Sequence, residues 1–140
     1  MTLAFREVQD VNLENVVSLW KTCELTRPWN DPYKDIQFAR EGATSTVLVG
    51  FFEERLVASV MVGHDGHRGV LYYLAVDPAF QKRGFGKATV AAAEAWLRER
   101  GVWKINLMVR SDNEKAGRFY ERLGYEVNPV LSFGKRIDVP

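Results

Sequence analysis

The sequence predicts an α+β fold in which a mixed, mostly antiparallel sheet is flanked by helices. Three strand-like runs follow one another between Thr46 and Val76 with short turns between them, which is typical of an antiparallel meander. Apolar residues recur at helical spacing before and after these runs. A glycine-rich loop then joins the third run to a helix. The predicted order of elements is βααβββαβαββ.

The N-terminal part is predicted to be one strand and two helices. Leu3 to Val8 forms the strand, and Asp10 is the expected N-cap of a first helix whose apolar residues are spaced i, i+3, i+4, i+7. Asp31 and Pro32 supply a cap and a proline at the first helical position of a second helix, which Gly42 ends.

The centre of the chain is predicted to be the meander. Thr46 to Phe52 and Leu56 to Gly63 form a hairpin, although the turn at Glu53 to Arg55 lacks the usual Asn-Gly signal. A looser turn leads to the strand Val70 to Val76. The helix Lys87 to Arg100 comes next.

The strand after that helix is predicted to run parallel to its predecessor. It spans Lys104 to Val109, and the helix between the two strands makes a βαβ unit. A capping box from Ser111 to Glu114 then opens a last helix. Two further strands are expected at Tyr125 to Val127 and Val130 to Ile137.

Length and charge restrict the class of protein. At 140 residues the chain fits a single domain spanning residues 1–140. Nineteen basic and eighteen acidic residues give a net charge of +1, so nothing indicates nucleic acid or an anionic membrane as a partner. The first residues lack a signal-peptide pattern, and no apolar run is long enough to span a bilayer. A cytoplasmic location is expected.

The single cysteine, Cys23, excludes an internal disulfide and suits a reducing compartment. It falls at the end of the first predicted helix with no histidine nearby. We therefore interpret it as a small buried apolar residue rather than as a nucleophile.

The loop from Gln81 to Gly86 is predicted to bind an anion. It joins a strand to a helix, where the first helical N–H groups have no intrahelical partner and the helix dipole adds partial positive charge. Gly84 and Gly86 allow positive φ and close approach of a ligand. Three basic residues, Lys82, Arg83 and Lys87, surround the loop, so a phosphate is the expected ligand. A solvated surface cluster is the alternative interpretation.

Two motifs carry a resemblance to a known family. The loop fits the form Gln/Arg-x-x-Gly-x-Gly/Ala, and Asn113 precedes a Phe-Tyr-x-x-Leu-Gly-Tyr run from Phe119 to Tyr125. With these motifs in this order the chain resembles the GNAT N-acetyltransferases over nearly its whole length. It resembles the bacterial YpeA-type branch more narrowly, in the segments 27–32, 64–69 and 131–136.

The resemblance implies a GNAT fold and acetyl-CoA as the acyl donor. It implies that the pyrophosphate lies on the backbone amides of the loop and that the pantetheine arm pairs with the preceding strand like an extra strand. The cofactor-binding residues implied are Leu74, Ala75, Val76, Gln81, Lys82, Arg83, Gly84, Phe85, Gly86, Lys87 and Asn113. Asn113 could instead serve only as a helix cap.

Acetyl transfer to an amine needs a neutral amine, a stabilised oxyanion and a proton for the departing thiolate. Tyr120 matches the family's tyrosine near the sulfur and is the expected acid; the alternative is a packed tyrosine. A main-chain N–H near Leu74 to Val76 is expected to hold the oxyanion. The resemblance implies that the amine attacks the thioester directly in a ternary complex, and this chemistry requires no covalent enzyme intermediate.

The general base is not identified by the sequence. Many members of the family have a glutamate on the strand before the loop, whereas Tyr72 to Val76 holds no carboxylate. Four side chains could act as the base, directly or through water: His64, Asp65, His67 and Glu24. The alternative is that the enzyme has no dedicated base. The two histidines are expected to make loop hydrogen bonds rather than bind zinc, so no metal is predicted.

The resemblance also suggests where the acceptor amine binds. The residues expected to wall this site are Trp29, Asn30, Tyr33, Asp65 and His67. The acceptor could be a small molecule, a protein N-terminus or a lysine. Because the strand carboxylate is missing, a non-catalytic acyl-CoA-binding or regulatory module is the alternative function. The final strands and exposed aromatic residues make a homodimer a further expectation.

Overall fold

The computed structural model describes residues 2–139, which form two compact units, one ending at Met108 and the other beginning at Val109. Each unit is described by itself, and a single domain over residues 1–140 stays a prediction. The first unit contains β1 (Ala4–Glu7), α1 (Leu13–Thr22), α2 (Pro32–Glu41), β2 (Ser45–Phe52), β3 (Arg55–His64), β4 (Gly69–Val76) and α3 (Phe85–Arg98). The second unit contains α4 (Glu114–Arg122).

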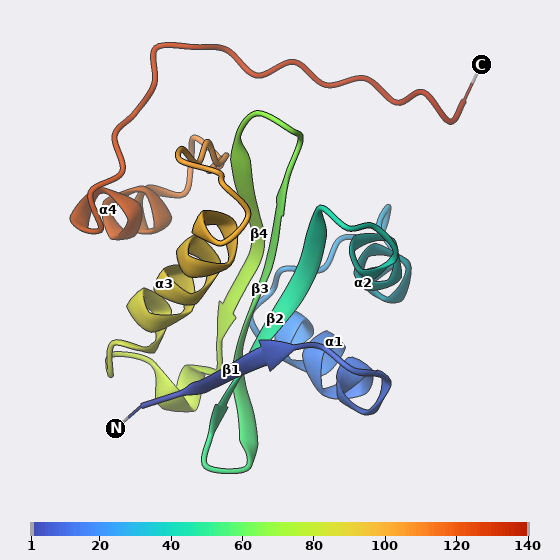
Figure 1. The fold of residues 1–140 in the computed structure, drawn as a ribbon, viewed down its shortest axis with the longest axis vertical. Helices are drawn as coiled ribbons and strands as arrows, with labels where there is room; N and C mark the ends of the chain where they lie inside the picture. The colour runs from blue at the N-terminus through green and yellow to red at the C-terminus, as the bar shows by residue number, and fades with distance from the viewer. Residues whose placement is uncertain (1, 140) are drawn as a thin grey trace. The chain divides into compact units, whose positions relative to one another are not determined.

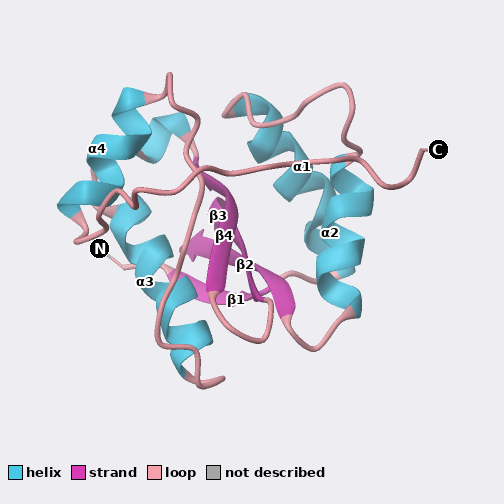
Figure 2. Ribbon diagram, turned by 90° about the horizontal axis from the view of Figure 1, so that it is seen from above, coloured by secondary structure: helices cyan, strands magenta, loops and turns pink. Residues whose placement is uncertain are grey.

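The sheet of the first unit is a four-stranded antiparallel meander in the order β1-β2-β3-β4 (Figure 1). Helices α1 and α2 cover one face, and α3 covers the other (Figure 2). Because both faces are covered, β2 and β3 are buried along most of their length instead of alternating between buried and exposed side chains. The predicted α+β class, with helices flanking a mostly antiparallel sheet, is confirmed.

The main core lies between the sheet and the helices α1 and α2. Trp20, Ile36 and Val49 are completely inaccessible to solvent, and each such side chain contributes roughly 1.5–3 kcal/mol through burial. The indole N–H of Trp20 donates a hydrogen bond to the hydroxyl oxygen of Ser59 at 2.8 Å, so the one polar atom of this large side chain is paired. Helix α1 is thereby fixed to the middle of β3.

The predicted strands of the meander agree with the structure to within a residue or two at each end. The hairpin turn consists of Glu53 and Glu54, and Glu53 takes the left-handed conformation at φ 56° without the glycine that usually provides it. Helix α2 also begins as predicted. The Asp31 side chain accepts hydrogen bonds from the backbone N–H groups of Tyr33 and Lys34, and Pro32 is the first helical residue.

The prediction that Asp10 caps the first helix was wrong. Residues Asp10–Asn12 form a short 3-10 turn, η1, and α1 begins only at Leu13. The side chain of Asn12 is buried and accepts a hydrogen bond from the backbone N–H of Gln9 at 3.0 Å. The carboxylate of Asp10 instead accepts a hydrogen bond from Arg40 at 2.8 Å, which ties the start of this segment to α2.

The predicted strand Lys104 to Val109 is reduced to a single parallel bridge between Ile105 and Gly69. Two hydrogen bonds of 2.9 Å make it, from Gly69 N–H to Lys104 C=O and from Asn106 N–H to Gly69 C=O. A Cβ at position 69 would lie 2.6 Å from Leu97 Cδ1, so only glycine lets α3 and this segment approach β4 so closely. The parallel direction was therefore predicted correctly, but not the length of the strand.

The second unit differs from the prediction in two respects. The N-cap of α4 is Asn113, whose side-chain oxygen accepts a hydrogen bond from the N–H of Ala116 at 3.1 Å, and not Ser111. The predicted strands at Tyr125 to Val127 and Val130 to Ile137 are irregular chain. Their β-branched and aromatic side chains suit a strand, but strand structure also requires a hydrogen-bonded neighbour, and the apolar side chains there are largely exposed.

Candidate functional site

The loop after β4 has the backbone of an anion-binding turn. Asp77 caps the short 3-10 turn η2 (Pro78–Phe80) by accepting a hydrogen bond from the N–H of Ala79 at 2.9 Å. Gly84 is the N-cap of α3 with φ 80°, which confirms the predicted positive φ at this position. The same expectation for Gly86 was wrong, because α3 begins at Phe85 and Gly86 lies in its first turn.

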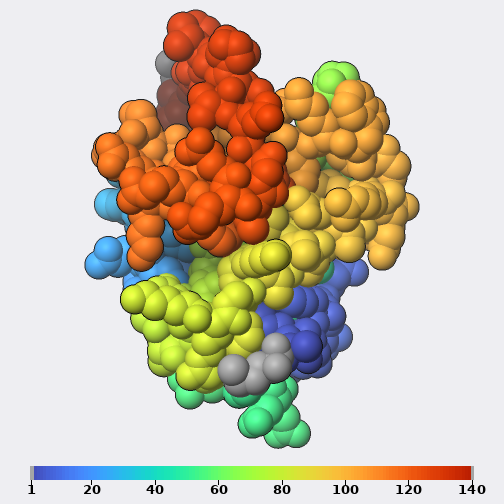
Figure 3. All heavy atoms as spheres, turned by 90° about the vertical axis from the view of Figure 1, so that its left-hand side faces the viewer, coloured from blue at the N-terminus to red at the C-terminus, as the bar shows by residue number. Residues whose placement is uncertain are grey.

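The surface around this loop is open and basic. Lys82, Arg83 and Lys87 are all exposed, and the loop and the start of α3 form part of the surface seen in Figure 3 (yellow-green). Beneath them the ring of Phe85 is buried, 5.8 Å from Phe52 and 6.4 Å from Phe80. An apolar base thus holds the loop while its three cations are exposed to solvent, where an anion can reach them.

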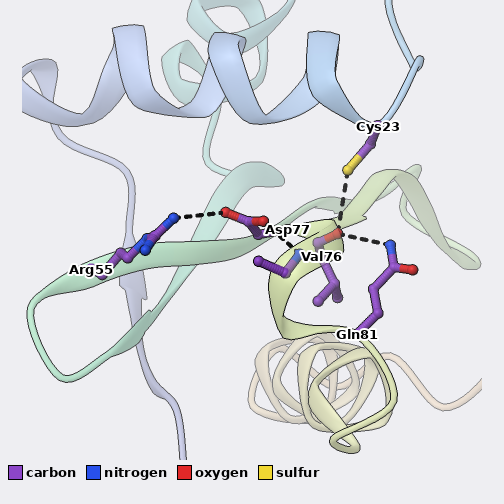
Figure 4. A network of polar contacts seen from close by, with 6 residues as sticks. Cys23, Arg55, Val76, Asp77 and Gln81 are labelled. Carbon is purple, nitrogen blue, oxygen red and sulfur yellow. Dashed lines mark hydrogen bonds and ion pairs between the residues drawn. The ribbon is translucent and has the colours of Figure 1, made fainter.

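The carbonyl oxygen of Val76 joins the end of β4 to the loop and to α1 (Figure 4). It accepts a hydrogen bond from the side-chain amide of Gln81 at 3.1 Å and from the thiol of Cys23 at 3.4 Å. The neighbouring Asp77 lies 3.5 Å from Arg55 and donates its backbone N–H to Val57 C=O at 2.8 Å. Gln81 therefore uses its side chain to fix the loop against the strand.

A β-bulge interrupts β4 just before this junction. Ser59 pairs with Ala75 and Met61 pairs with Tyr72, so Tyr73 and Leu74 together lie opposite a single residue of β3. Tyr73 takes the left-handed conformation at φ 54°, which is strained for a side chain with a Cβ. Such a bulge interrupts the regular ladder and frees main-chain groups for a ligand.

Two helices hold Tyr73 in this conformation. Its ring stacks on the buried Trp20 of α1, with centroids 3.9 Å apart and an interplanar angle of 4°. Its hydroxyl donates a hydrogen bond to the Asp35 carboxylate of α2 at 2.6 Å. Burial, and next the Asp35 hydrogen bond, raise the pKa of the Tyr73 phenol well above its ordinary value, so the phenol keeps its proton.

A cavity of about 540 Å³ opens beside the bulge. One end is polar and includes Arg27, Asn30, Asp35 and Tyr73, while the walls are largely apolar. Tyr72 and Tyr73 both line it although neighbouring strand residues ordinarily face opposite sides of a sheet. The bulge therefore gives the cavity two consecutive aromatic side chains.

The residues expected to wall an acceptor site are only partly brought together. Asn30 lines the cavity. Trp29 is 72% exposed and Tyr33 is 46% exposed, and the cavity lining includes neither. Asp65 and His67 belong to the turn between β3 and β4.

That turn is held by its own side chains. The Asp65 carboxylate accepts hydrogen bonds from the N–H groups of Arg68 and His67, both at 2.8 Å, and these bonds lower the pKa of Asp65. The Nδ1 atom of His64 accepts a hydrogen bond from Gly66 N–H at 3.0 Å, which confirms the loop hydrogen bonding predicted for His64. None of the four candidate bases (His64, Asp65, His67 and Glu24) is among the residues that line the cavity.

Metal-binding clusters and membrane-spanning helices are both absent from the described residues, 2–139. They contain no group of three or more histidine, cysteine or acidic side chains placed to hold a metal ion. None of the helices described has the length and apolar character needed to cross a membrane.

Tyr120 and Asn113 belong to the second unit. The Tyr120 ring makes edge-on contacts with Phe119 and Tyr125, at centroid distances of 5.1 and 5.5 Å. Burial raises the pKa of Tyr120 to about 12, so its phenol is protonated at neutral pH. Asn113 caps α4 through its side-chain oxygen, which leaves its NH₂ group as a donor for other partners.

Asp35 and Tyr73 are not among the residues predicted from the sequence. A carboxylate is typical of the strand before the loop in the GNAT family, whereas the structure brings one to that strand from α2, 38 residues away along the chain. The available signal was a pair of adjacent tyrosines at positions 72 and 73 of a strand with one buried face.

Comparisons with known proteins identify the family. A model described as the acetyltransferase (GNAT) family matches residues 13–125. A protein of Yersinia enterocolitica named acetyltransferase is 42% identical over 137 residues, which are 98% of this chain and 97% of that protein. A Yersinia pestis protein named as an N-acetyltransferase has the same identity and coverage.

Solved structures show the same fold. The aminoglycoside N-acetyltransferase AAC(6')-Iy in complex with CoA matches with a TM-score of 0.82 at 17% identity, over 96% of this chain and 95% of that one. A transcriptional regulator from Bacillus halodurans matches with a TM-score of 0.79 at 21% identity, over 95% and 99%. With these relatives, this fold and this loop, the chain belongs to the GNAT family and is an acetyltransferase.

Proposed function

We propose that this acetyltransferase takes acetyl from acetyl-CoA and transfers it to a primary amine by direct attack in a ternary complex. The observation that carries the proposal is the junction between β4 and α3, where a left-handed Gly84 opens a helix beside three exposed cations. Such a junction suits a diphosphate. The solved AAC(6')-Iy, which shares the fold, is bound to CoA in its crystal.

In this proposal the main-chain N–H groups of Gly84 to Lys87 hold the pyrophosphate, and Lys82 and Arg83 add charge. Leu74 to Val76 pair with the pantetheine arm. Gln81 positions the loop through its hydrogen bond to Val76. Asn113 contacts the cofactor with the NH₂ group that its capping role leaves over.

The chemistry is assigned to the bulge and to Tyr120. The amine nitrogen attacks the thioester carbonyl, the C–N bond forms, the C–S bond breaks, and the amine gives up a proton to water. A main-chain N–H freed by the bulge at Tyr73 and Leu74 holds the oxyanion. Tyr120 donates its proton to the departing thiolate; burial raises its pKa to about 12, so the phenol carries that proton at neutral pH.

The acceptor is proposed to enter the cavity beside β4. Asn30 supports this placement because it is both an expected acceptor residue and part of the lining. Trp29, Tyr33, Asp65 and His67 are then proposed to act at the mouth of the site, with a small molecule or a peptide amine as the partner. The solved AAC(6')-Iy has a bisubstrate analogue, CoA-S-monomethyl-acetylneamine, as its ligand, so the fold accommodates donor and acceptor together.

Calorimetric titration with acetyl-CoA, followed by mass spectrometry of a panel of amines incubated with acetyl-CoA and the enzyme, tests the proposal. We expect saturable binding of acetyl-CoA and a mass gain of one acetyl group on at least one amine. Absence of acetyl-CoA binding would overturn the assignment of the loop. Binding without transfer to any amine would instead favour the alternative of an acyl-CoA-binding module.

We also propose a homodimer. The exposed apolar side chains of the second unit, which include Leu131, Phe133 and Ile137, support it because large apolar groups in a row are usually covered. Light scattering with size-exclusion chromatography should give twice the chain mass of 16.0 kDa, and a monomer would contradict the proposal.

A further inference from the structure

The polar end of the cavity beside β4 carries a single carboxylate. Among the residues that line the cavity, Asp35 is the only acidic one. Apolar side chains that include Phe38, Met61 and Val70 form much of the remaining wall. A ligand that fills this space therefore meets a hydrocarbon surface and one anion.

The carboxylate of Asp35 is held in place before any ligand arrives. The Tyr73 hydroxyl donates to its Oδ2 atom at 2.6 Å, and the Tyr73 ring is fixed by its stack on Trp20. Trp20 is itself tied to Ser59 by the buried hydrogen bond of its indole N–H. A carboxylate has about four lone-pair sites, so the hydrogen bond from Tyr73 leaves acceptor capacity for a second donor. An anion positioned in this way binds a cation without a further ordering cost.

The other charged residue of the lining is already engaged with the main chain. The Arg27 Nη1 atom donates to the carbonyl oxygens of Glu24 and Thr26, both at 2.9 Å, and so closes the connection between α1 and α2. Asn30 and Tyr73 are neutral. Arg27 keeps its positive charge, and its Nη1 atom is directed at these carbonyl oxygens, so Asp35 is the group among the lining residues that can pair with a cationic ligand.

We propose that Asp35 binds the ammonium group of the acceptor, and that the apolar walls take its hydrocarbon part. The inference rests on the proposed function, since it treats the cavity as the acceptor site of the acetyl transfer. The class of acceptor is a primary amine attached to an apolar body. An ammonium group at Asp35 lies beside the hydroxyl of Tyr73, whose main chain belongs to the bulge. Before attack the ammonium loses its proton to water.

The test compares a charged probe with a neutral probe of the same shape, 2-phenylethylammonium and 2-phenylethanol, titrated into the CoA-saturated enzyme by two-dimensional NMR. We expect the ammonium to bind at least about tenfold more tightly than the alcohol, because hydrogen bonds to charged groups are the stronger ones. Asp35→Asn should abolish that preference, since the amide still accepts from Tyr73 but carries no charge. Tyr73→Phe should weaken ammonium binding less, because the charge remains but is no longer held.

Asp10→Asn is the matched control. It removes an exposed carboxylate that pairs with Arg40 at the other end of α2, and it should leave the preference for the ammonium unchanged. Thermal melting of each variant verifies that it is folded. Equal affinity of wild-type enzyme for the two probes, no binding of either, or an undiminished preference in Asp35→Asn would overturn the inference. The binding of acetyl-CoA is measured separately, so none of these results would by itself overturn the proposed function.

Discussion

The loop after β4 and the cavity beside β4 are built in different ways. The loop uses consecutive residues, main-chain N–H groups and one left-handed glycine, and its geometry follows from a strand, a turn and a helix in sequence. The cavity uses side chains from α2, β3, β4 and the connection after α1. The proposed donor site is thus a local structure, whereas the proposed acceptor site exists only after the sheet and its helices have packed.

This difference gives the two sites different sensitivities. A change in the core between α1 and the sheet should disturb the cavity before it disturbs the loop, because Tyr73 rests on Trp20. A change in the loop backbone should weaken donor binding and leave the cavity intact. The following predictions test that separation, from the largest expected effect to the smallest.

Trp20→Ala should have the largest effect. It empties a fully buried site and removes both the stack on Tyr73 and the hydrogen bond to Ser59, so we expect a loss of roughly 3–5 kcal/mol in the free energy of unfolding. Urea denaturation measures it. Trp103→Ala is the control, because Trp103 is 77% exposed, and it should cost far less. A similar loss in both variants would show that Trp20 has no special role beneath the bulge.

Tyr120→Phe should reduce the rate of acetyl transfer by roughly 100-fold, within the range for loss of a general acid. The affinity for acetyl-CoA, measured by calorimetry, should stay nearly unchanged because the ring and its contacts with Phe119 and Tyr125 are kept. Phe119→Leu serves as a comparison that changes packing without removing a hydroxyl. A transfer rate equal to that of the wild type would remove Tyr120 from the mechanism.

Gly84→Ala should weaken acetyl-CoA binding by about tenfold, which corresponds to about 1.4 kcal/mol. Its Cβ would point into open space at the loop, the space that we assign to the pyrophosphate. Gly101→Ala is a close control, because Gly101 has φ 81° against φ 80° for Gly84 and is equally open. Both variants carry the same backbone cost of about 1 kcal/mol in stability. Equal affinities in the two variants would contradict the assignment of the loop.

The ionisation of Tyr120 should leave stability unaffected at neutral pH. Burial raises its pKa to about 12, above the ordinary value of about 10 in the unfolded chain. The native state holds the proton more tightly, so this contribution to stability is complete below about pH 10 and is lost as the pH rises through about 12. Tyrosinate absorbance of the wild type minus that of Tyr120→Phe should therefore rise only near pH 12. A rise near pH 10 in the folded protein would contradict the burial of this phenol.

Local structures could be predicted from the sequence more fully than structures that depend on packing. Asp31, Pro32 and Gly84 act on their own neighbours, so the start of α2 and the phosphate loop could be predicted from local pattern. The cap of α1 could not be predicted in this way. The buried side chain of Asn12 bonds to the N–H of Gln9, and the carboxylate of Asp10 pairs with Arg40 of α2.

At the proposed acceptor site, tertiary structure and not local sequence determines which side chains meet. The hydrogen bond between Asp35 and Tyr73 joins residues of a helix and a strand whose approach depends on the packing of Trp20. The bulge is equally invisible in the residues 70–76, since nothing in their alternation signals an extra residue. The C-terminal segments show the converse, because strand propensity at Val130 to Ile137 did not suffice to make strands.

The hydrogen bond from Cys23 to Val76 affects whether the thiol of this protein could react with acetyl-CoA. Acetyl-CoA is a thioester, and a protein thiolate close to it could capture the acetyl group by thiol exchange. The thiol of Cys23, the only cysteine of the chain, donates a hydrogen bond to the carbonyl oxygen of Val76, a residue that we propose pairs with the pantetheine arm. Burial raises the pKa of the Cys23 thiol, and the nearby charge of Asp77 adds to this, so the sulfur stays protonated and a poor nucleophile. In the proposed function this removes one competing nucleophile, so the acetyl group is left for the amine.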